Sequence, residues 1–125
     1  MSDAPPVILC IDDDSDILAF LKIVLESEGY AFRGASSAEE GLQVYKAEPP
    51  DLVIVDLMME EVDAGTGFVK ELQLLGNTAP VLMLSSVGDN LSATIDYGAL
   101  GLAGVFQKPL AKEHLLALIR AKLSG

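Results

Sequence analysis

Four carboxylates crowd a short segment that directly follows an apolar run. The stretch "ILCIDDDSDI", residues 8–17, contains Asp12, Asp13, Asp14 and Asp16. Like charges this close repel one another, and burying them costs several kcal/mol unless something compensates. Three explanations are open: a solvated helix start, a calcium loop, or an acidic pocket that holds a divalent cation.

A helix start explains only part of the cluster. Asp14 or Ser15 can cap the helix that follows, and acids near its positive end are favourable. This interpretation accounts for Asp14 and Asp16. It does not explain Asp12 and Asp13, which come directly after the apolar run.

A calcium loop fits the spacing poorly. Asp12, Asp14 and Asp16 alternate as in such loops, but Ile17 stands where glycine is required and Ile23 where a bidentate Glu should be. Magnesium suits the segment better, because it binds one or two carboxylates, phosphate oxygens and several waters.

Further polar residues follow later apolar runs. Asp56 comes directly after "LVIV", Ser85-Ser86 follow "VLML", and Gln107-Lys108-Pro109 follow "VF". If these runs are adjacent parallel strands, then three acids, a hydroxyl and an amine converge at one edge of a sheet.

The apolar pattern of the sequence predicts the strands and helices on which these residues lie. Short apolar runs alternate with segments of helical spacing, which predicts parallel strands joined by crossover helices. The central runs are apolar at consecutive positions, as in strands that helices cover on both faces. The predicted strands are Val7–Ile11, Ala31–Phe32, Leu52–Val55, Val81–Leu84 and Val105–Phe106. We therefore predict one doubly wound α/β domain over residues 1–125.

The composition and net charge of the chain limit the classes of molecule that it is expected to bind. Half of the 125 residues are apolar and the formal net charge is -11, which argues against direct binding to nucleic acid or an anionic membrane. The single Cys10 lies in the first apolar run and is expected in the core. The start "MSDAPP" lacks a positive segment, and the apolar run after it is too short for a signal peptide. We expect a cytoplasmic protein.

The sequence resembles the receiver domains of two-component response regulators. The resemblance covers nearly the whole chain through "ILCIDDD", "DLVIVDLMM", "VLMLSS" and "VFQKPL". It implies a flavodoxin-like fold with strand order 2-1-3-4-5 and helices on both faces. It also implies that Asp56 is the phosphoryl acceptor, that Asp12 and Asp13 bind Mg²⁺ together with Asp56, and that Met58 gives the metal a backbone carbonyl.

The same resemblance implies the remaining roles. Ser85 stands where receivers have a switching Ser or Thr, Lys108 is the pocket lysine, and the peptide before Pro109 is expected to be cis. The partners would be a histidine kinase or phosphotransfer protein and a downstream protein target. The domain would be no enzyme beyond assisting its own phosphorylation and dephosphorylation.

The sequence departs from the family pattern in three places. Glu60 replaces a usual proline, and Ala64–Thr66 are interpreted as an insertion that lengthens a surface loop. Val105 occupies the position of the aromatic switch residue. The predicted fourth helix, residues 90–100, is rich in glycine, which lowers helix stability.

Two other functions also fit parts of this sequence. A phosphohydrolase of the haloacid-dehalogenase type would use Asp12 as its nucleophile, although substrate selection there normally takes a larger chain. A receiver-like docking module would act without phosphorylation. A direct phosphorylation assay separates the second rival from a functional receiver.

Overall fold

Five parallel strands form one sheet whose spatial order differs from their order in the chain. In a computed structural model, which describes residues 5–56, 64–85, 104–107 and 112–124, the order is β2-β1-β3-β4-β5. The strands are β1 (Val7–Ile11), β2 (Ala31–Ala35), β3 (Leu52–Asp56), β4 (Val81–Ser85) and β5 (Gly104–Gln107). The predicted fold and strand order are confirmed.

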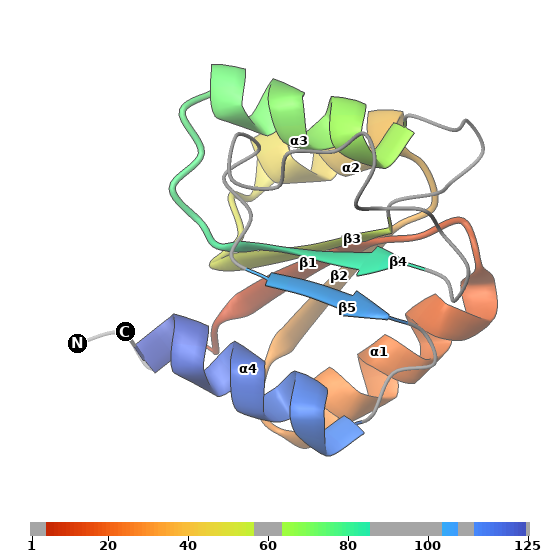
Figure 1. The fold of residues 1–125 in the computed structure, drawn as a ribbon, viewed down its shortest axis with the longest axis vertical. Coiled ribbons are helices and arrows are strands. Elements are labelled where there is room, and N and C mark those ends of the chain that lie inside the picture. Colours follow the sequence, from red (N-terminus) through yellow and green to blue (C-terminus); the bar gives the residue numbers. More distant parts are fainter. Residues whose placement is uncertain (1–4, 57–63, 86–103, 108–111, 125) are drawn as a thin grey trace.

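Helices cover both faces of this sheet (Figure 1). One face carries α1 (Ser15–Ser27) and α4 (Lys112–Ser124), and the other carries α2 (Ala38–Ala47) and α3 (Ala64–Leu74). No helix among the described residues is long and apolar enough to cross a membrane.

The core consists of two clusters separated by the sheet. Side chains of β1 alternate between them: Ile8 and Cys10 pack on the side of α1 and α4, while Leu9 and Ile11 pack on the side of α2 and α3. Because successive residues of a strand point to opposite faces, a strand buried on both sides must be apolar throughout. This requirement explains the continuous apolar runs in the sequence.

Glycines end two of the helices. Gly29 and Gly76 have φ values of 86° and 79°, a left-handed conformation that other residues adopt at a cost.

Some sequence predictions need correction. Ala64–Thr66 do not extend a surface loop but form the first turn of α3. Leu75 continues the helical spacing of Phe68 and Leu72, but its exposed fraction is 46%, just after α3 ends at Leu74. The predicted helix over residues 90–100 lies outside the described part of the chain.

Gly41 lets α2 approach β1 closely. A Cβ atom at this position would lie 2.9 Å from two side-chain atoms of Ile11 and 3.1 Å from the Phe68 ring. Ile11 is the last residue of β1 and is followed directly by Asp12. The contact between α2 and Ile11 therefore helps to fix the position at which the acidic segment begins.

Replacing Gly41 by Val is expected to destabilise the fold by about 2 kcal/mol, because the added methyl groups must displace Ile11 and Phe68 in a filled core. Urea unfolding followed by circular dichroism measures this change. Gln43→Val, at an exposed position of the same helix, is the control and should change stability by less than about 0.5 kcal/mol. Equal stability of the two variants would contradict the close packing.

Candidate metal centre

Three carboxylates meet where β1 and β3 end. One oxygen each of Asp12, Asp13 and Asp56 lies within 4.8 Å of the others. Ile11 pairs with Val55 in the parallel ladder, so the residues that follow them, Asp12 and Asp56, are neighbours. Their exposed fractions are 1% and 2%, while Asp13 is exposed. The cluster therefore joins two buried carboxylates to one that reaches solvent.

Local backbone hydrogen bonds hold Asp12 in place. Its N–H donates to the Ala35 carbonyl at 3.1 Å, which continues the pairing of β1 with β2 by one residue. Its Oδ1 accepts from the Asp14 N–H at 2.9 Å. The Asp12 carboxylate is thus oriented by the turn that leads into α1.

Asp14 caps α1, as predicted. Its Oδ1 accepts from the Asp16 N–H at 2.9 Å, and its extended backbone (φ -89°, ψ 108°) is typical of a helix N-cap. The acidic segment therefore serves two purposes: Asp14 and Asp16 begin the helix, and Asp12 and Asp13 lie at the end of the sheet.

The three carboxylates fit a small divalent cation. An octahedral ion with oxygens at about 2.1 Å has adjacent ligands about 3.0 Å apart and opposite ligands about 4.2 Å apart. Oxygens within 4.8 Å of one another need only small side-chain rotations to reach that geometry. A set of carboxylate oxygens with an opening to water also matches the preference of Mg²⁺ over metals that favour nitrogen or sulfur.

The negative charge of this cluster affects its surroundings. Burial raises the pKa of the Cys10 thiol, and the nearby charge of Asp12 raises this pKa further. Cys10 therefore stays a neutral core residue, as the sequence predicted. The same field favours any cation that enters between the three carboxylates.

The structure describes only part of the predicted site. Asp12, Asp13 and Asp56 are brought together. Ser85 is the last residue of β4, beside the end of β3, but only its backbone is described. Met58, Lys108 and the peptide before Pro109 lie outside the described residues. The sequence did not indicate one contributor, the Asp14 N–H that orients Asp12.

The sequence is similar to known proteins over most of its length. The family model described as the response regulator receiver domain matches residues 8–120. The transcriptional regulatory protein GlrR of Escherichia coli (strain K12) is 38% identical over 95% of this chain and 26% of its own length. The alkaline phosphatase synthesis transcriptional regulatory protein PhoP of Bacillus subtilis is 31% identical over 93% of this chain and 48% of its own length. The chain thus spans about a quarter to a half of these relatives.

Solved structures agree with the sequence matches. A putative response regulator from Chloroflexus aurantiacus superimposes with a TM-score of 0.85 at 32% identity, covering 97% of this chain and 99% of that one. A receiver domain protein described as CheY-like, from Methanospirillum hungatei, has a TM-score of 0.87 at 28% identity, covering 96% and 94% of the two chains. The similarity therefore extends over the whole fold.

Proposed function

Because this chain belongs to the response regulator receiver domains of two-component signalling, we propose that Asp56 accepts a phosphoryl group in a Mg²⁺-dependent reaction. The observation that carries the proposal is the cluster of Asp12, Asp13 and Asp56 within 4.8 Å. Asp56 is the member of this cluster that ends β3. Its side chain is buried, which limits the access of water that would compete with the carboxylate for the phosphoryl group.

The chemistry is a transfer between two anions. One oxygen of the Asp56 carboxylate forms a bond to phosphorus while the bond from phosphorus to the donor breaks, and an acyl phosphate results. The main barrier is the approach of a negative phosphoryl group to a negative pocket. When bound, Mg²⁺ would supply positive charge there and align phosphoryl oxygens.

The residues of the chain have separate roles in this proposal. Asp12, Asp13 and Asp56 hold the metal by their carboxylates, with Met58 adding a backbone carbonyl. Lys108 neutralises a phosphoryl oxygen, and the Ser85 hydroxyl donates a hydrogen bond to the new phosphoryl group. The last two interactions exist only with phosphate in place, so they stabilise the phosphorylated state relative to the unphosphorylated one.

We also propose two kinds of protein partner for this domain. A histidine kinase or phosphotransfer protein supplies the phosphoryl group in the cytoplasm, and a downstream protein or attached output domain responds to it. The formal net charge of -11 favours contact with basic protein surfaces over nucleic acid. The domain assists its own phosphorylation and dephosphorylation and turns over no separate substrate.

Magnesium is expected to stabilise the folded protein, because a dication bound only by the native carboxylate cluster shifts unfolding by mass action. At a free concentration one hundred times the dissociation constant the gain is about 2.7 kcal/mol, which raises the melting temperature by several degrees. Thermal melting with MgCl₂, compared with NaCl at equal ionic strength, measures the effect. A melting temperature that does not respond to millimolar Mg²⁺ would contradict a metal site and leave the docking module as the better function.

A further inference from the structure

The outer strand β2 has a row of backbone groups that point away from the sheet. Ala31 donates to the Pro6 carbonyl and Ala35 accepts from the Asp12 N–H, so both residues direct their backbone groups toward β1. In a parallel pair this direction alternates along the strand. Phe32 and Gly34 therefore direct their N–H and C=O groups to the outer edge of β2.

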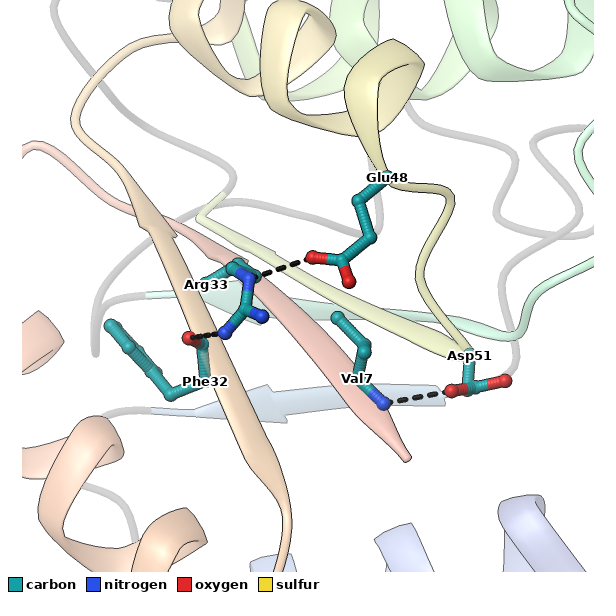
Figure 2. Close-up of polar contacts among 5 residues, drawn as sticks. All are labelled: Val7, Phe32, Arg33, Glu48 and Asp51. Atoms are coloured by element: carbon teal, nitrogen blue, oxygen red, sulfur yellow. Dashed lines mark hydrogen bonds and ion pairs between the residues drawn. The ribbon is translucent and has the colours of Figure 1, made fainter. Parts of the chain in front are cut away.

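Arg33 lies across this edge. Its Nε donates to Glu48 Oε1 at 2.7 Å, and one of its terminal nitrogens donates to the Phe32 carbonyl at 2.9 Å. Figure 2 shows the guanidinium between the end of α2, where Glu48 is the C-cap, and the backbone of β2. The Arg33 side chain thus donates a hydrogen bond to one of the two outward carbonyls of β2, that of Phe32.

The two residues of β2 that direct backbone groups outward differ in the cover that their side chains give. Gly34 is exposed and has no side chain, and the tip of the Phe32 ring lies 2.8 Å from the position that a Cβ atom of Gly34 would occupy. Phe32 is partly buried and packs against the core cluster on the side of α1 and α4. Within β2, Arg33 is therefore the charged residue that lies where an incoming strand would pair.

We propose that Arg33, held by Glu48, blocks the outer edge of β2 from pairing with a second copy of this chain. An edge strand offers the complementary donors and acceptors that an identical strand needs, and two copies can pair antiparallel about a two-fold axis. To form that pair, Arg33 must release the Phe32 carbonyl and place its charge elsewhere. The proposal concerns a surface separate from the carboxylate cluster and does not depend on phosphorylation.

The test is the oligomeric state of matched variants measured by sedimentation equilibrium across a concentration series. Arg33→Ala is expected to dimerise with a dissociation constant at least about tenfold lower than that of the original chain. Glu48→Gln should show a smaller change in the same direction, because Arg33 keeps its contact with the Phe32 carbonyl but loses its charged anchor. Lys70→Ala, at an exposed site on α3, removes one positive charge as Arg33→Ala does. This control should leave the oligomeric state unaltered.

Amide hydrogen exchange locates the contact. In concentrated Arg33→Ala protein, the N–H groups of Phe32 and Gly34 should become protected, whereas in the original chain they exchange faster than those of Ala31 and Ala35. A variant that remains monomeric at every concentration would overturn the proposal. So would an Arg33→Ala dimer in which the Phe32 and Gly34 amides stay unprotected, or dimerisation of Lys70→Ala to the same extent.

Discussion

Asp56→Asn is expected to lose phosphorylation by a small-molecule donor such as acetyl phosphate, with labelling at least about a hundredfold below that of the original chain. The amide that replaces the carboxylate has nearly the same shape but carries no anionic oxygen to attack phosphorus. Because Asp56 is buried at the end of β3, the isosteric change leaves the packing around it intact. Loss of labelling then reports chemistry rather than unfolding.

Intact-protein mass spectrometry after incubation with the donor and Mg²⁺ measures the labelled fraction. Asp16→Asn is the matched control, since it makes the same charge change at an exposed position in the first turn of α1. This control should be labelled like the original chain. Labelling of Asp56→Asn to the control level would rule out Asp56 as the acceptor.

Asp13→Asn is expected to weaken Mg²⁺ binding by at least about tenfold, because it removes one of three carboxylates that lie within 4.8 Å of one another. Asp13 is exposed, so its replacement disturbs no core contact. The rate of phosphorylation should fall in parallel at low Mg²⁺ and recover in part at high Mg²⁺, since the acceptor itself is retained.

Isothermal titration calorimetry gives the affinity directly. Asp14→Asn is a close control: it removes a charge one residue away, and Asn caps helices about as well as Asp. If both variants lose affinity equally, then the total charge of the segment matters rather than ligation by Asp13.

Much of this architecture could be predicted from the sequence because burial on both faces of a sheet imposes continuous apolar runs. "VILCI", "LVIV" and "VLML" locate β1, β3 and β4, and the acids at their ends locate the carboxylate cluster. The weaker edge strands were predicted too short: β2 extends to Ala35 and β5 begins at Gly104. An outer strand needs fewer apolar residues, so its ends leave little signal in the sequence.

Other features depend on geometry that no local pattern encodes. Leu75 continues the helical spacing of Phe68 and Leu72, yet its side chain is 46% exposed while those two are buried. The contact between Arg33 and Glu48 depends on where α2 ends relative to β2. The roles of Met58 and Lys108 stay predictions, based on the family resemblance.

The acyl phosphate is expected on Asp56, and the position of this group in the phosphorylated protein can be determined chemically. Borohydride reduces an aspartyl phosphate to homoserine, so treating the phosphorylated protein and mapping its peptides identifies the modified residue. If Asp56 is the acceptor, homoserine is expected at position 56 alone, dependent on Mg²⁺ and absent from Asp56→Asn. Homoserine at Asp12 would contradict it and indicate instead a phosphohydrolase that uses Asp12 as its nucleophile.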